Sequence, residues 1–195
     1  EEKLKEYIEN NYPQVSEMSH QLKEKVLKSG LVPEGFAIPM RNMRAEAALF
    51  RKENIALEVE LNQLSIDLDK ILGAQTVQWK GEEQTARQME IVFRDKDRGE
   101  RARGWELTRK RQLEDRQAID ENWVKLFKLR MQVAKNAGKA SFREYIWEDY
   151  KRFDYTPADC MRFHEAIEEV VVPAVNRIAE KRKQALGIID LRYYD

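Results

Sequence analysis

The sequence predicts a mainly α protein, a multi-helix bundle of long antiparallel helices with one short β-hairpin. Of the 195 residues, 42% are hydrophobic and 36% are charged. Typical soluble domains have about 45–50% hydrophobic and about 25% charged residues, so this composition favours long, well-solvated helices over a compact sheet. Leucines recur at helical spacing in the first half of the chain, and strand-forming residues gather in one short stretch only.

The chain begins with a predicted N-terminal helical segment, residues 1–29. A break is expected near Tyr12-Pro13, because proline cannot donate to the preceding turn. The second helix should end at Ser29-Gly30. Residues 30–42 follow, and two glycines and two prolines among them predict an irregular connection. Its many apolar side chains indicate a connection that is packed rather than free.

Residues 43–195 are predicted to form a helical body. Its first element is one long helix over about 43–72, in which apolar residues are spaced by four, three, four and three: Leu57, Leu61, Leu64, Leu68 and Ile71. This seam is typical of an antiparallel helix hairpin within one bundle. A dimeric coiled coil is the alternative, although it would need more heptads.

The only predicted β structure lies near residues 75–85. Thr76, Val77 and Trp79 are strand formers, and Lys80-Gly81 is a turn sequence, so a short hairpin is expected. A short helix should follow over about 86–93.

Three later helix starts carry a capping residue with an acidic residue three positions on: Asp97 with Glu100, Ser141 with Glu144, and Thr156 with Asp159. Such pairs satisfy free backbone N–H groups and suit the positive end of the helix dipole. Gly138 and Gly187 should end the preceding helices. The last helix, about 157–186, contains Pro173, which predicts a bent rod in two parts.

Charge and cysteine content limit the function classes. Lysine plus arginine and aspartate plus glutamate both number 35, so no net field would draw the chain to nucleic acid or to an anionic membrane. Cys160 is the only cysteine, which suits a reducing compartment. The first residues are charged, unlike a signal peptide. We expect a cytoplasmic protein with no nucleic-acid and no membrane partner.

The arginine-rich run over residues 94–116 surrounds Trp105 and is the strongest local nucleic-acid pattern. Acidic residues interrupt it at helical spacing, however, so most of the charges can pair with each other. We therefore interpret this run as a solvated helix face.

His164-Glu165 gives the only pattern that resembles a zinc-peptidase helix. The motif H-E-x-x-H places two imidazoles four residues apart, so that both reach one zinc ion. Here Glu168 stands four residues after His164, and the only other histidine is His20. Neighbouring carboxylates such as Glu168 and Glu169 point about 100° apart on a helix and form no dyad. We predict no catalytic, metal-binding or cofactor-binding residue in this chain.

Several consecutive blocks of the sequence nevertheless resemble one family of peptidases. They are "EYIENNYPQVSEMSHQL", "SGLVPEGFAIPMRNMRAEAALFRKEN", "GAQTVQWKGEE", "DRGERARGWELTRKRQLEDR", "KNAGKASFREYIWEDYKRFDYTPADCMRFHEAIEEVVVPAV" and "LGIIDLRYYD". In order and along essentially the whole chain, they are similar to bacterial oligoendopeptidases related to oligoendopeptidase F and thimet oligopeptidase. "FDYTPADCMRFHEAIEEVVVP" is the most specific block. The final "LRYYD" departs from the L-R-P-W-D pattern expected in close relatives, and Lys80 stands where an acidic residue is usual.

The resemblance implies a cytoplasmic zinc peptidase that cleaves short peptides in a channel between two helical halves. It also implies that zinc and the catalytic residues belong to a region downstream of the part matched here, so no metal role passes to His164 or Glu165. Two interpretations follow. The chain is a non-catalytic portion of such an enzyme, which forms one wall of the channel and binds the missing catalytic half or itself. Alternatively, it is a stand-alone helical binding or scaffold module.

Overall fold

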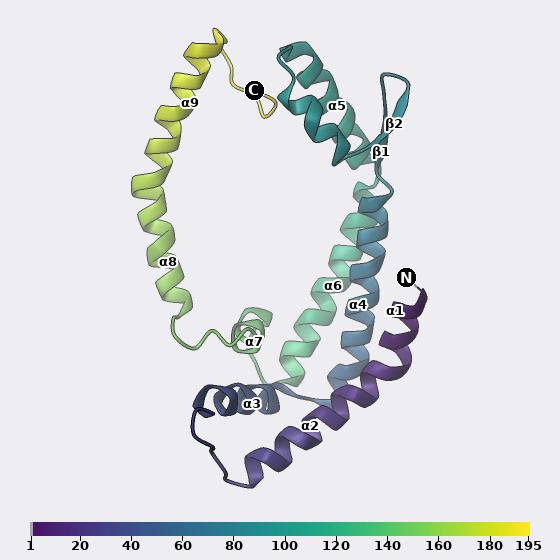
Figure 1. The fold of residues 1–195 in the computed structure, drawn as a ribbon, viewed down its shortest axis with the longest axis vertical. Helices are drawn as coiled ribbons and strands as arrows, with labels where there is room; N and C mark the ends of the chain where they lie inside the picture. Colours follow the sequence, from purple (N-terminus) through teal and green to yellow (C-terminus); the bar gives the residue numbers. More distant parts are fainter. Residues whose placement is uncertain (1) are drawn as a thin grey trace. The chain divides into compact units, whose positions relative to one another are not determined.

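The computed structural model describes residues 2–195 and divides the chain into two compact units. Unit 1 comprises the residues up to Ile71 together with Gln117–Phe153, and unit 2 comprises Leu72–Arg116 together with Asp154–Asp195. Figure 1 shows that helices dominate both units. The mainly α fold with one short hairpin is therefore confirmed. The three sequence segments predicted as domains, 1–29, 30–42 and 43–195, are a different division and stay a prediction.

The helices of unit 1 are, in chain order, α1 (Glu2–Glu6), the π-helix η1 (Tyr7–Asn11), α2 (Tyr12–Lys28), α3 (Ala37–Leu49), α4 (Lys52–Gly73), α6 (Arg116–Asn136) and α7 (Phe142–Asp149). The last two residues of α4 and the first residue of α6 fall in unit 2. Helix α3 packs against α2 and α7. Apolar side chains from α3, α4 and α6 form the buried core, among them Met40, Leu49, Ile55, Leu126 and Val133.

The elements of unit 2 are β1 (Thr76–Trp79), β2 (Glu82–Thr85), the 3₁₀-helix η2 (Gln88–Arg94), α5 (Arg98–Glu114), α8 (Pro157–Ala166), the π-helix η3 (Ile167–Val171) and α9 (Val172–Leu186). Strands β1 and β2 pair antiparallel, with Thr76 opposite Thr85 and Trp79 opposite Glu82. None of the helices that residues 2–195 form combines the length and apolarity needed to cross a bilayer.

Helices α4 and α6 lie antiparallel, as the leucine seam predicts. The side-chain amide of Asn54, near the start of α4, donates to the carbonyl of Val133 at 3.1 Å, near the end of α6. The amide of Asn122, near the start of α6, donates to the carbonyl of Leu64 at 2.9 Å. Because one pair joins the start of α4 to the end of α6, and the other joins points nearer the opposite ends, the two helices must run in opposite directions.

The single helix predicted over 43–72 is wrong, because the chain breaks at Phe50. This residue has extended backbone angles, φ −61° and ψ 131°, and separates α3 from α4. The Arg51 guanidinium stabilises the break by donating to the carbonyl of Ala48 at 2.9 Å and to that of Asn136 at 3.1 Å. His20 stacks on the Phe50 ring with 3.8 Å between ring centroids. Tertiary contacts, rather than glycine or proline, therefore end α3.

Two π-helical stretches stand where breaks or bends were predicted. Both precede a proline by the same distance: η1 ends two residues before Pro13, and η3 ends two residues before Pro173. The amide of Val172 donates to the carbonyl of Ile167, five residues back. This wider turn accommodates the proline, which has no N–H to donate to the preceding turn. The predicted break at Tyr12-Pro13 is thus a continuous helix, whereas the two-part rod over 157–186 is present as α8, η3 and α9.

The connection after Gly30 is shorter and more exposed than the sequence suggests. Helix α3 already begins at Ala37, and Pro39 lies in its first turn, where a missing N–H is harmless. The side chains of Leu31 and Ile38 are 69% and 62% exposed. Met40 alone among the apolar residues of 30–42 is buried, so the expected packing of this stretch is not found among the described residues.

Most of the turns, helix caps and helix ends predicted over residues 75–187 are confirmed. Lys80 and Gly81 both have positive φ, 51° and 90°, which is the type I′ geometry that suits a tight hairpin. The helix expected at 86–93 is the 3₁₀-helix η2 rather than an α-helix. The three predicted caps are confirmed, and at Thr156 both bonds of a capping box are present. Gly138 and Gly187 follow the predicted helix ends with φ of 74° and 63°.

Candidate functional site

The C-terminal segment, residues 187–195, is bound to helix α5 through an arginine–carboxylate cluster. The guanidinium of Arg98 donates two parallel hydrogen bonds to the Asp195 carboxylate, at 2.8 and 2.9 Å. Arg101 adds a third at 3.2 Å and also donates to the carbonyl of Tyr194 at 2.5 Å. Bidentate pairs of this kind fix geometry as well as charge. The cluster thus positions the residues that precede Asp195.

The same cluster changes the ionisation of Asp195. The hydrogen bond from Arg98, with further bonds from the Arg192 amide and Arg101, lowers the pKa of the Asp195 carboxyl to about 2. Its side chain has no exposed surface, whereas Arg98 is 44% exposed. The carboxylate therefore keeps its charge over the whole neutral and mildly acidic range.

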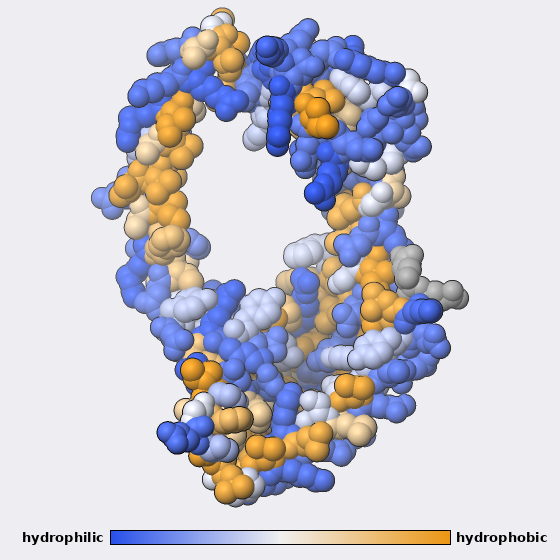
Figure 2. All heavy atoms as spheres, in the orientation of Figure 1, coloured by the Kyte–Doolittle hydropathy of each residue, from blue (hydrophilic) through white to orange (hydrophobic). Residues whose placement is uncertain are grey.

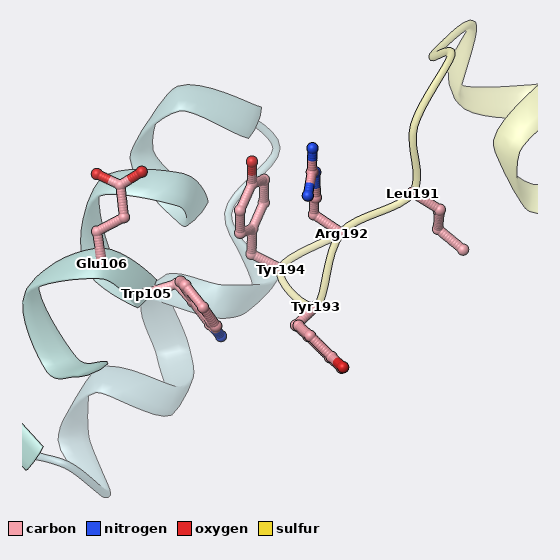
Figure 3. Close-up of a pocket in the computed structure, with 6 residues that line it drawn as sticks. All are labelled: Trp105, Glu106, Leu191, Arg192, Tyr193 and Tyr194. Atoms are coloured by element: carbon pink, nitrogen blue, oxygen red, sulfur yellow. The ribbon is translucent and has the colours of Figure 1, made fainter. Parts of the chain in front are cut away.

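An aromatic pocket lies between α5 and the bound segment (Figure 3). Trp105 and Tyr193 have nearly parallel rings, with 8° between planes and 6.1 Å between centroids, and the Tyr194 ring is tilted by 60° at the same distance. The pocket has a volume of about 700 Å³ and is completed by Glu106, Leu191 and Arg192. We call this site the aromatic pocket.

The aromatic pocket has surfaces that suit binding. Tyr193 is 94% exposed, so most of its ring surface is open to a partner. The Arg98 guanidinium already lies 5.4 Å from the Tyr194 ring centre, and Arg109 lies 5.7 Å from that of Trp105, which are cation–π distances. Glu106 and Arg192 add one charge of each sign. Extended aromatic faces beside both charges suit the side chains and polar backbone of a peptide.

A second polar cluster occurs in unit 1, within the leucine seam. The Tyr12 hydroxyl donates to the Glu58 carboxylate at 2.7 Å. Burial raises the pKa of the Glu58 carboxyl, and this hydrogen bond opposes the rise. Burial, followed by the negative charges of Glu58 and Asp149, raises the pKa of Tyr145 to about 12. Glu58 borders a small pocket of about 220 Å³. The hydroxyl and this half-buried carboxyl together join α2 to α4.

The two histidines belong to different units of the structure. His164 is an exposed residue of α8, and His20 stacks on Phe50 in unit 1. Among residues 2–195, no group of three or more His, Cys, Asp and Glu side chains is placed to hold a metal ion. The donor set of the described chain therefore does not fit the zinc that the resemblance implies for the family.

The arginine-rich run is only partly the self-paired helix face that was predicted. Arg103 contacts Glu100 at 3.0 Å and Arg111 contacts Asp115 at 2.6 Å, both at helical spacing. Arg98 and Arg101 instead pair with Asp195, which is more than ninety positions away in the sequence. Reasoning from the sequence missed this site because neither helical period nor motif links α5 to the C-terminal segment. The aromatic residues of "LRYYD" were the only available signal.

Comparison with family models gives no match, and neither does comparison with curated proteins. Solved structures do match. PZ peptidase A, solved with an inhibitor, superposes with a TM-score of 0.92 at 21% identity, over 100% of this chain and 35% of that one. A Bacillus anthracis str. Ames protein described as an oligoendopeptidase F superposes with a TM-score of 0.86 at 20% identity, over 100% of this chain and 36% of that one. A further oligoendopeptidase F structure gives 0.80 at 19%, over 97% and 36%.

At these identities the comparison concerns the fold. The chain spans about a third of the length of the solved structures that it matches. The predicted resemblance to a portion of this family is confirmed at that level. This chain therefore has the fold of about one third of an oligoendopeptidase F or PZ peptidase A chain.

Proposed function

We propose that the chain is the non-catalytic portion of a zinc-dependent oligoendopeptidase and forms one wall of the channel in which short peptides are cleaved. The observation that carries this proposal is the match of the whole chain to about a third of three peptidase structures. A match of the whole chain at a TM-score of 0.92 is unlike a shared helix hairpin, which any bundle could supply.

In this proposal the chemistry is divided between two portions of one enzyme. The polypeptide that corresponds to the unmatched two thirds supplies zinc and the groups that act on the scissile bond. The present chain binds and confines the peptide, and its aromatic pocket, with Trp105 and Tyr193 beside Glu106 and Arg192, contacts the substrate. We place the enzyme in the cytoplasm, in line with the single cysteine, Cys160.

A full-length chimera tests the proposal. The matched third of PZ peptidase A is replaced by this chain, and hydrolysis of quenched-fluorescent peptides is measured with zinc and after chelation. We expect chelator-sensitive cleavage by the chimera and none by this chain alone under the same conditions. Cleavage by the isolated chain would contradict the division of chemistry. A folded but inactive chimera would favour the alternative, a stand-alone helical binding or scaffold module.

The role of the aromatic pocket is tested separately in the active chimera. Trp105→Ala should raise KM for peptide hydrolysis with a smaller effect on kcat, because it removes binding surface away from the reacting bond. Leu113→Ala is a matched control, since Leu113 is a 65% exposed residue of the same helix and does not line the pocket. Equal kinetics for the two variants would show that the pocket does not contact substrate.

A further inference from the structure

Helices α8 and α9, joined by η3, form a rod of thirty residues in unit 2 (Figure 1). The capping box at Thr156 begins it and Gly187 ends it. Within unit 2 the main contacts of α8 and α9 are with η3, their own continuation. The rod therefore has almost no tertiary packing along its length inside the unit that contains it.

One side of this rod carries a row of large apolar side chains. Phe163, Val171, Val175 and Ile178 are 65%, 47%, 55% and 66% exposed. Val171, Val175 and Ile178 are spaced by four and three residues, which places them on the same side of a helix. The eight residues from Phe163 to Val171 include the wide π-turn of η3, which holds about one residue more than an α-turn, so they span about two turns and bring Phe163 onto the same side. Val170, which is 66% exposed, lies next to them. We call these five residues the rod face, and Figure 2 shows that hydrophobic side chains gather along the rod.

An uncovered rod of this kind is not a self-sufficient structure. Most of the stability of a protein helix comes from packing its apolar stripe rather than from helix propensity. Contiguous exposed apolar surface on a soluble protein marks an interaction site. The caps fix where the rod begins and ends, but they cannot replace a partner along its side. Something must cover the rod face in the working protein.

The structural comparisons point to a partner for the rod face. PZ peptidase A contains the same fold at a TM-score of 0.92, and the match covers all of this chain, rod included, but 35% of that chain. We propose that the rod face is the docking surface for the polypeptide that corresponds to the unmatched two thirds, the catalytic portion. This inference rests on the proposed function. The partner must present apolar side chains to the rod over at least four helical turns.

Cysteine labelling measures whether the rod face is covered. In a Cys160→Ser background, Ile178→Cys places one thiol on the rod face, and Glu169→Cys places one on the opposite, exposed side of the same rod. The maleimide reaction rate of each thiol is compared between this chain alone and the full-length PZ peptidase A chimera. For Ile178→Cys we expect a rate at least tenfold lower in the chimera, and for Glu169→Cys an unchanged rate.

The outcomes separate this inference from the proposed function. An active chimera in which Ile178→Cys reacts as fast as in the isolated chain overturns the docking surface and leaves the proposed function intact. An inactive chimera with both thiols fully reactive overturns both. Shielding of Ile178→Cys in the isolated chain, growing with protein concentration, would assign the rod face to a second copy and overturn the proposed partner. Selective shielding in an active chimera supports the proposal.

Ile178→Asp gives a functional check in the same chimera. A charge in a buried interface centre should weaken the association between the two portions about 30-fold or more, and it should lower the thermal midpoint of the chimera. Leu113→Asp, on the exposed side of α5, is the control with equal exposure, 65% against 66%. The isolated chain should tolerate both changes equally, because both side chains are already in solvent.

Discussion

The hydrogen bond from Tyr12 to Glu58 should stabilise unit 1 by holding a charge in a half-buried site. Tyr12→Phe removes the hydroxyl that donates to the Glu58 carboxylate at 2.7 Å. A hydrogen bond to a charged group contributes about 1.5–3 kcal/mol. At about 2–4 °C per kcal/mol for a chain of this size, the thermal midpoint should fall by roughly 3–12 °C at neutral pH.

The pKa of Glu58 determines how the effect of Tyr12→Phe on stability changes with pH. Burial raises the folded-state pKa of Glu58 above its unfolded value, so the folded state holds this proton more tightly. The stabilisation is complete below the unfolded pKa of about 4.3 and is lost as pH rises through the folded pKa. Without the Tyr12 hydroxyl, that pKa rises further. Tyr12→Phe should therefore cost more at pH 7.5 than at pH 4.

Urea unfolding at these two pH values provides the assay. Tyr145→Phe is the control, because it deletes a hydroxyl in the same region while keeping the ring that stacks on Phe142. Glu58→Gln should remove most of the pH dependence and should reduce the cost of Tyr12→Phe in the double variant. A loss from Tyr12→Phe that is equal at both pH values, or no larger than that of Tyr145→Phe, would refute the reasoning.

Three further predictions concern unit 2. Gly104→Ala should destabilise the folded state by about 1–2 kcal/mol in thermal unfolding, because the added Cβ would lie 2.8 Å from Cγ1 of Val92. Gly73→Ala is the control: its added Cβ would have no atom within 4 Å, so the change should be neutral or stabilising. Asp195→Asn should release the C-terminal segment and change tryptophan fluorescence at pH 7. Wild type should show that change only as pH falls from about 3.9 through about 2, where the depressed pKa lies. Thr156→Ala should cost about 1 kcal/mol of helix stability, seen as lower helicity by circular dichroism.

Local chemistry is what made much of the fold predictable. The capping residue Thr156 and the terminating Gly187 mark the ends of the rod through bonds that span a few residues. The Lys80-Gly81 turn fixes the hairpin in the same way. Each signal acts within one turn of the chain, so a single sequence is enough to interpret it.

The errors arise where distant contacts decide the local conformation. Phe50 adopts an extended conformation although no glycine or proline is near, and Arg51 stabilises it through the carbonyl of Asn136, which is 85 positions away. The aromatic pocket likewise depends on the pairing of Arg98 with Asp195, 97 positions apart. Neither partner can be chosen from one sequence by periodicity. The family resemblance predicted the fold without predicting these contacts.

The π-helical turn at Ile167–Val171 has a consequence for how the rod is compared between relatives. A wide turn holds about one residue more than an α-turn, so the positions after it are shifted by about 100° relative to a regular helical wheel. A homologue that lacks one residue here would keep Phe163 and Ile178 on the same side of the helix. In an alignment, a gap of one residue in this stretch would then indicate that the direction of the rod face is conserved. A relative that aligns without a gap but lacks Pro173 would instead have its rod face rotated after this point.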